Sequence, residues 1–154
     1  MFSMRKRSRW RFRRSLHCSC KAFRSSIANL LTLPFRKPET ALADPWPAPS
    51  VIPKCTAAEK SCDYESELAI IIGRSAKDVS EAEAMNFVLG YTAANDISAR
   101  QSQFAQSQWC YSKGFDGACP IGPTVVSPAL VPDPSILRLR GIKNGRVLQE
   151  CGVE

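Results

Sequence analysis

Histidine, closely paired cysteines and long apolar runs are the features that this sequence has least of. The 154-residue chain contains one histidine and seven cysteines without a C-x-x-C pair, and it has no apolar run near the ~20 residues that cross a bilayer. A zinc site needs closely spaced Cys and His ligands, yet only Cys18 and Cys20 stand near His17. We therefore expect neither a zinc domain nor a membrane-spanning protein. The odd cysteine count without a secretory leader indicates reduced thiols in an intracellular chain.

Acidic residues are missing from residues 1–38, which carry eleven Lys or Arg. The remainder carries ten basic and fourteen acidic residues, so the net charge of +7 comes from one end. A nucleic-acid-binding domain carries its positive charge on the folded part, so nucleic acid is not the expected partner. The Arg- and Ser-rich start has the composition of a transit peptide. A basic arm that binds anions or nucleic acid, or a segment with no role in the fold, are the alternatives.

These observations divide the chain into two parts. Residues 1–30 are assigned to a basic segment that is disordered or serves in targeting, and residues 31–154 to a folded domain. The expected location is cytoplasmic or mitochondrial, with no membrane partner.

Several short strand patterns predict an α+β fold with a mixed or antiparallel sheet. Residues 68–72 form an apolar, β-branched run typical of a short buried strand. The segment PIGPTVVSP, residues 120–128, is a second strand pattern. Two alternating runs over residues 136–150 meet at Asn144-Gly145, which predicts a β-hairpin. The chain stops after the second hairpin strand, and an unpaired edge promotes association, so we expect a sticky or homodimeric protein.

One helical pattern is evident, in SEAEAMNFVLG, residues 80–90. Ser80 is a candidate N-cap, Glu83 completes a capping box, and Gly90 is placed where a helix ends. The proline-rich segment before the first strand, residues 35–54, is expected to be extended.

The stretch DYESELAIIIG places Glu65 and Glu67 two residues apart where the first strand begins. Residues i and i+2 of a strand point to the same face, ~6.5–7 Å apart at Cα, so the two carboxylates lie side by side. A hard divalent ion such as Mg²⁺ or Mn²⁺ would offset their repulsion, whereas a solvated E-x-E on a wet face is the alternative. Asp96 is the candidate third ligand. Lys113 is either a cation for an anionic substrate or a surface lysine paired with Asp116.

Three stretches, DYESELAIIIG, GYTAANDISAR and SKGFDGACPIGP, resemble successive motifs of the fumarylacetoacetate hydrolase family. The shorter acylpyruvase and oxaloacetate tautomerase members are the most similar in pattern. FRKPETALADP, VPDP and the Asn-Gly hairpin also match in order. The resemblance covers roughly residues 31 to 150 and implies a mixed β-roll, the fold of the C-terminal catalytic domain of that family.

The resemblance also implies a site. Glu65 and Glu67 of E-x-E and Asp96 of the N-D-x-S-A-R-like segment would hold Mg²⁺ or Mn²⁺, Lys113 would be catalytic and substrate-binding, and Gln103 would contact substrate. The implied activity is hydrolysis of acylpyruvates or keto–enol exchange of oxaloacetate, that is, of small β-dicarbonyl or α-keto acids. The ion would act as a Lewis acid while a base activates water or moves a proton.

The chain also departs from the family pattern. Members of this size carry an N-Y-x-x-H-x-x-E-like segment whose His and Glu form the base pair, and no such segment occurs here. Gln101 replaces the usual aspartate after S-A-R, and Gly117 replaces a Thr or Ser. The T-P-x-G-V-G segment and the last strands are not present before Glu154. The alternative is therefore a truncated member, catalytically impaired, that keeps only its metal site.

Overall fold

The computed structural model describes residues 36–153, and within them the strands form four two-stranded sheets. The longer pairs are antiparallel: β3 (Ser66–Ile72) with β4 (Val88–Asn95), and β7 (Arg138–Lys143) with β8 (Arg146–Gly152). The shorter pairs are antiparallel β2 (Cys62–Asp63) with β5 (Ser98–Ala99), and parallel β1 (Leu42–Ala43) with β6 (Cys119–Pro120). The helices are short: α2 (Lys54–Glu59), α3 (Glu81–Ala84), α4 (Arg100–Ala105) and α5 (Cys110–Lys113), with 3₁₀ turns η1 (Glu39–Ala41), η2 (Met85–Phe87) and η3 (Pro134–Ile136).

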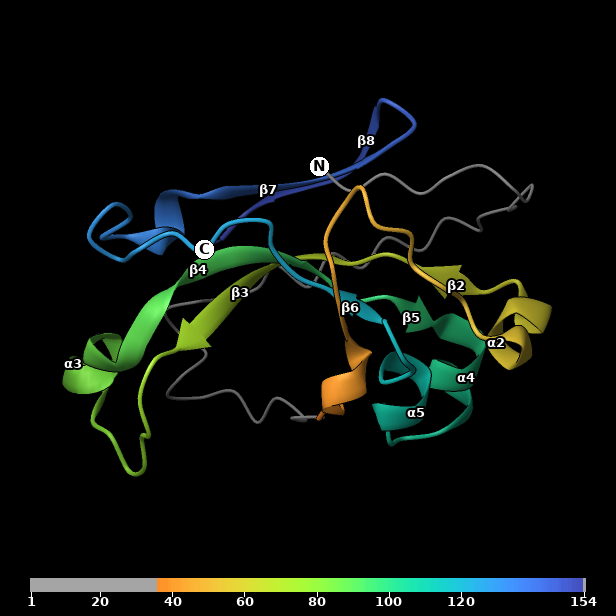
Figure 1. Ribbon diagram of the computed structural model, residues 1–154, viewed down its shortest axis with the longest axis horizontal. Helices are drawn as coiled ribbons and strands as arrows, with labels where there is room; N and C mark the ends of the chain where they lie inside the picture. Colours follow the sequence, from red (N-terminus) through yellow and green to blue (C-terminus); the bar gives the residue numbers. More distant parts are fainter. Residues whose placement is uncertain (1–35, 154) are drawn as a thin grey trace.

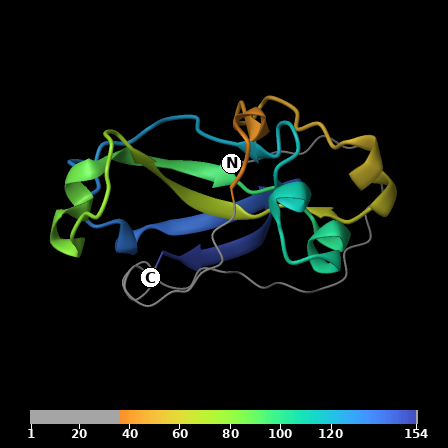
Figure 2. The same cartoon turned by 90° about the horizontal axis from the view of Figure 1, so that it is seen from below.

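The β3–β4 pair forms the centre of the molecule (Figure 1). Helices α2, α4 and α5 gather at one end of this pair, and α3 lies at the other. The β7–β8 hairpin runs alongside, with β7 next to β3 (Figure 2). Strands and helices are thus mixed as an α+β fold requires, and the expected fold class is confirmed.

The strand expected at residues 68–72 is confirmed and begins two residues earlier, at Ser66. It is not the buried strand that its apolar sequence predicts, because the side chains of Ile70 and Ile72 are 39% and 58% exposed. Among the described residues β3 forms a strand ladder only with β4, and no further strand covers Ile70 and Ile72.

The prediction of a helix over residues 80–90 was wrong beyond the first turn. Only Glu81–Ala84 is α-helical, and η2 leads directly into β4, where Gly90 pairs with Ile71 instead of ending a helix. β-branched and aromatic residues from Val88 onward favour a strand, and pairing with β3 outweighs the helical periodicity. The Ser80 hydroxyl donates to the Glu83 carboxylate at 2.6 Å without capping a backbone N–H.

Of the strand expected at residues 120–128, only Pro120 lies in β6, and Ile121 and Val126 form isolated bridges. The prolines remove N–H donors that a continuous ladder would need. The hairpin over residues 136–150 is confirmed, with Asn144 and Gly145 both at positive φ as a tight I′-type turn requires.

The hairpin is fastened to β3 through one side-chain amide. Gln149 accepts a hydrogen bond from the Ser66 backbone N–H at 2.8 Å and donates to the Ser66 carbonyl at 2.9 Å, so it replaces one rung of a sheet ladder. Gly141 permits this approach, because a Cβ there would lie 2.6 Å from Ser66 Oγ. The hairpin thus restrains the residue that lies between Glu65 and Glu67.

The remaining sequence expectations concern cysteines and membranes. Cys55, Cys62, Cys110 and Cys119 are free thiols, whereas Cys151 is disulfide-bonded, so the expectation of reduced thiols was wrong for that residue. No helix within residues 36–153 has the length and apolar character to span a bilayer. The basic segment 1–30 lies outside the described residues, and its assignment stays a prediction.

Self-association is the first testable expectation. Strand β8 pairs only with β7 among the described residues, and Val147 and Leu148 on it are exposed, so a second chain can dock against this edge. We expect light scattering coupled to size exclusion to give about twice the 17.0 kDa of one chain. Val147→Lys should shift the mass toward that of one chain, because a charged edge resists pairing. A single monomeric species for the unaltered chain would contradict the expectation.

Candidate metal centre

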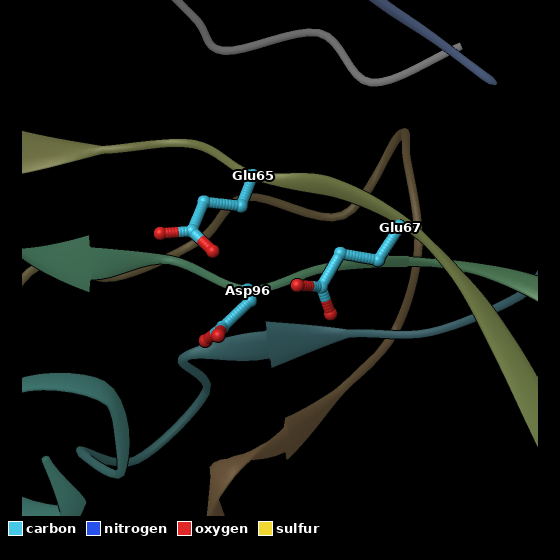
Figure 3. Close-up of side chains that lie close together, drawn as sticks. All are labelled: Glu65, Glu67 and Asp96. Atoms are coloured by element: carbon cyan, nitrogen blue, oxygen red, sulfur yellow. The ribbon is translucent and has the colours of Figure 1, made fainter. Parts of the chain in front are cut away.

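Two neighbouring strands bring three carboxylates to one place (Figure 3). Glu67 lies in β3 and Glu65 immediately before it, so their side chains project from the same face. Asp96 immediately follows β4, the antiparallel partner of β3, and its N–H donates to the Glu65 carbonyl at 2.9 Å. The Glu65 N–H donates in turn to Asn95 Oδ1 at 3.1 Å. The register of β3 against β4 therefore fixes Asp96 opposite the two glutamates.

The three carboxylates lie close enough to share one cation. One oxygen from each of Glu65, Glu67 and Asp96 lies within 4.8 Å of the others. Asp96 is buried, and its Oδ1 accepts no hydrogen bond among the described residues. An all-carboxylate donor set suits a hard divalent ion such as Mg²⁺ or Mn²⁺, and within the described part of the chain the buried Asp96 Oδ1 is held only by an ion pair with Lys37. The residues present therefore fit the ion that the sequence predicts.

Lys113 is buried inside this cluster. Its Nζ donates to Asp96 Oδ2 at 2.8 Å and to Glu65 Oε1 at 2.9 Å, and its side chain is 3% exposed. The alternative of a surface lysine paired with Asp116 was wrong, because α5 turns the side chain inward. A buried ammonium is tolerated when its charge is paired and hydrogen-bonded, as it is here.

Arg100 supports Glu65 from the other side. Its Nη1 contacts Glu65 Oε1, its Nη2 lies 3.2 Å from Asp63 Oδ2, and Nη1 also donates to Gln103 Oε1 at 2.9 Å. Burial raises the pKa of Glu65, but the Lys113 hydrogen bond and charge, together with Arg100, more than offset it. The pKa of Glu65 therefore lies below its ordinary value, and this carboxylate stays ionised.

Glu67 has the opposite electrostatic environment. Burial of its carboxyl group and the negative charges of Asp96 and Glu65 raise its pKa from 4.5 to about 7. The residue as a whole keeps an exposed surface, but its carboxylate turns toward the other two (Figure 3). No Lys or Arg among the described residues forms an ion pair with it. Glu67 is thus the carboxylate whose charge is least balanced, and a bound cation would favour its ionised form.

The structure brings together most of the residues singled out from the sequence. Glu65, Glu67, Asp96 and Lys113 form one cluster, and buried Gln103 joins it through Arg100. Their roles as ligands and catalytic groups stay predictions. Sequence reasoning did not single out Lys37 and Arg100, although both stand in motifs that carried the family resemblance, F-R-K-P and S-A-R.

The fold and this cluster define a class: an α+β domain whose β3 and β4 present a carboxylate-rich candidate site for a divalent ion. A model of the fumarylacetoacetate hydrolase C-terminal family matches residues 21–154, and the chain belongs to that family.

Three similar proteins illustrate its range. The chain is 56% identical over 86 residues to a caffeoylpyruvate hydrolase of Neonothopanus nambi, covering 53% of this chain and 28% of that protein. It is 43% identical over 89 residues to a mitochondrial oxaloacetate tautomerase of Xenopus laevis, covering 56% of this chain and 28% of that protein. The crystal structure of a 2-hydroxyhepta-2,4-diene-1,7-dioate isomerase from Mycobacterium marinum superimposes with a TM-score of 0.68 at 43% identity, covering 76% of this chain and 44% of that one. The chain therefore spans less than half the length of these relatives.

The raised pKa of Glu67 makes a prediction about stability without metal. Between pH 4.5 and about 7 the folded chain binds a proton at Glu67 that the unfolded chain does not, so the free energy of unfolding falls as pH rises through this window. Glu67→Gln removes that fall, and the variant should gain stability over the unaltered chain more at pH 8 than at pH 5. Urea unfolding in the presence of chelator measures the difference.

The matched control is Glu81→Gln, on the exposed surface of α3 at the other end of the β3–β4 pair (Figure 1). It should change stability equally at both pH values. An equal effect of Glu67→Gln at pH 5 and pH 8 would show that the Glu67 carboxyl titrates normally.

Proposed function

We propose that this chain provides the divalent-metal site of a hydrolase or tautomerase that acts on small β-dicarbonyl or α-keto acids. The observation that carries the proposal is the convergence of Glu65, Glu67 and Asp96 within 4.8 Å around a buried lysine. The similar hydrolase, tautomerase and isomerase named above support the reaction class. Mg²⁺ or Mn²⁺ is the proposed ion, because carboxylate oxygens are the ligands that these hard cations prefer.

Each residue of the site has a separate task in this proposal. Glu65, Glu67 and Asp96 would hold the ion, which supplies Lewis acidity toward the adjacent oxygens of a keto acid. Lys113 would stabilise the negative charge that develops on an enolate, since its buried ammonium is already oriented by Asp96 and Glu65. A buried ammonium that is fixed by two carboxylates needs little reorganisation as the charge develops.

Gln103 is the proposed substrate-contacting amide. It is buried, and its Oε1 accepts a hydrogen bond from Arg100, which fixes the orientation of the carboxamide. The NH₂ end is then directed away from the guanidinium and is available as a donor to a substrate oxygen. Arg100 thus positions a metal ligand, Glu65, and a substrate-binding residue, Gln103, at the same time.

A second candidate function is divalent-metal binding with little or no turnover. The observation that favours it concerns the catalytic base. The only histidine of the chain, His17, does not stand in the sequence context of the family His/Glu pair. Hydrolysis needs a group that activates water, whereas keto–enol exchange needs only a proton shuttle. If the site works without a histidine, tautomerisation is the less demanding reaction.

Location and assembly complete the proposal. The similar oxaloacetate tautomerases of Xenopus laevis, Rattus norvegicus and Homo sapiens are described as mitochondrial. A mitochondrial location is therefore proposed, in keeping with the basic composition of residues 1–30, with the cytoplasm as the alternative. The substrate is a small keto acid, and a homodimer is the proposed assembly.

Turnover assays separate the two candidates. We expect the full chain to convert acetylpyruvate or oxaloacetate in the presence of Mg²⁺, and the activity to disappear in chelator. Glu67→Gln should lower Mg²⁺ affinity and turnover on the order of 100-fold or more, since loss of an outer partner of a metal ligand already costs ~10–100-fold. Because this variant is expected to fold at least as well as the unaltered chain, the loss cannot be attributed to unfolding.

Glu81→Gln serves again as the control and should leave turnover unchanged. Mg²⁺ binding by calorimetry without turnover of either substrate would establish the second candidate. Turnover that persists in chelator would exclude both.

A further inference from the structure

Lys37 contributes a second cation to the carboxylate cluster. Its Nζ lies 2.5 Å from Asp96 Oδ1, the same oxygen that accepts no hydrogen bond, so the contact is an ion pair without hydrogen-bond geometry. The positive charge of Lys37 also opposes, without reversing, the rise in the pKa of Glu67 and of Cys119, in keeping with an ammonium near both groups. Lys37 therefore lies where the three carboxylates converge.

The two lysines of the cluster are held differently. Lys113 is 3% exposed and donates to two carboxylates, whereas Lys37 is 18% exposed and pairs with one. Lys37 reaches the cluster from residues 36–38, ahead of η1, while Lys113 comes from helix α5. Lys113 is thus fixed in place, and Lys37 is the cation that can leave at lower cost.

The backbone near Lys37 is anchored, so only its side chain needs to move. Pro38 packs against Gly114, where an added Cβ would lie 2.9 Å from Pro38 Cδ. The Ala41 N–H donates to the Pro38 carbonyl at 3.0 Å and holds the start of η1. The Lys37 ammonium also contacts the Lys113 carbonyl, which ties the side chain to the end of α5.

We propose that Lys37 is an intramolecular counter-ion that competes with the divalent ion for Asp96 and thereby sets the metal affinity of the site. The inference rests on the proposed function, because it assumes that Glu65, Glu67 and Asp96 hold a divalent ion. In the metal-free chain Lys37 neutralises Asp96 and limits the repulsion among the carboxylates. When the ion binds, the Lys37 side chain swings toward solvent and Lys113 keeps its place.

Electrostatics favours this exchange, and the weaker hold on Lys37 decides which of the two ammonium groups leaves. Mg²⁺ binds carboxylate oxygens at ~2.1 Å. An ion on Asp96 Oδ1 would then lie within about 5 Å of an ammonium that keeps its present position 2.5 Å from the same oxygen. Two positive charges at that separation repel strongly in a site with little water. Binding of the ion therefore includes the cost of displacing Lys37.

Metal affinity tests the proposal. Lys37→Met should bind Mn²⁺ about tenfold or more tightly than the unaltered chain, measured by calorimetry, because a competing unit charge has been removed. Lys37→Arg keeps the charge and should bind within a few-fold of the unaltered chain. Lys77→Met removes an equal charge from an exposed loop and should also leave the affinity nearly unchanged, since salt screens distant exposed charges.

Chemical labelling tests the displacement directly and does not depend on activity. Reductive methylation followed by mass spectrometry should modify Lys37 slowly in chelator and several-fold faster with saturating Mn²⁺, as its ammonium leaves Asp96. Lys113 should stay slow and Lys77 fast under both conditions, which controls for unfolding and for reagent access.

The outcomes separate this inference from the proposed function. Equal Mn²⁺ affinity of the unaltered chain and Lys37→Met, or Lys37 labelling that does not respond to Mn²⁺, would overturn the inference and leave the metal site intact. If the Lys37→Met variant bound Mn²⁺ and the unaltered chain did not, the inference would be supported in its strongest form, with Lys37 blocking the site. Absence of Mn²⁺ binding by both proteins would overturn the proposed function and the inference together.

Discussion

The repulsion among three carboxylates is the constraint on which the rest of this structure depends. Glu65, Glu67 and Asp96 place oxygens within 4.8 Å of one another, an arrangement that would separate the strands if nothing opposed it. Two kinds of force oppose it. The β3–β4 register joins the backbones of residues 65 and 96 by a hydrogen bond, and Lys113 bridges two of the three carboxylates. The carboxylate cluster is therefore held together by a strand ladder and by a buried cation.

The site also depends on parts of the chain that carry no chemistry themselves. The β7–β8 hairpin is more than 70 residues from the E-x-E motif in sequence, yet Gln149 brackets the backbone of Ser66, between the two glutamates. Gly141 lets the hairpin come close enough for that contact. On the opposite side, Arg100 connects Asp63, Glu65 and Gln103, so α4 is tied to the start of β3. Both contacts limit how far the two glutamates can move apart, and this pre-organisation reduces the cost of binding an ion.

Features that depend on neighbouring residues in the sequence were predicted correctly. Predictions failed where contacts with a distant segment determine the local structure. The Asn144-Gly145 turn needs only two residues able to adopt positive φ, and the side-by-side glutamates need only the two-residue period of a strand. The helix expected over residues 80–90 was wrong because its second half pairs with β3, which no helical periodicity can reveal. The position of Lys37 depends on the packing of Pro38 against Gly114, and the raised pKa of Glu67 depends on Asp96 across the sheet. The order of the motifs along the sequence suggested the cluster, but the balance of charges within it depends on the three-dimensional arrangement of the side chains.

That charge balance bears on how the proposed metal site could be stable both without and with an ion. Around the cluster stand four acidic groups, Asp63, Glu65, Glu67 and Asp96, and three cations, Lys37, Lys113 and Arg100. With a pKa of about 7, Glu67 holds a proton for part of the time near neutral pH, and the metal-free cluster is then electrically neutral. In the proposed exchange, the two positive charges of one divalent ion would take the place of that proton and of the Lys37 ammonium. Because the total charge near the buried Asp96 does not change, neither state has to leave an uncompensated charge away from water, which is the most costly arrangement in a protein interior.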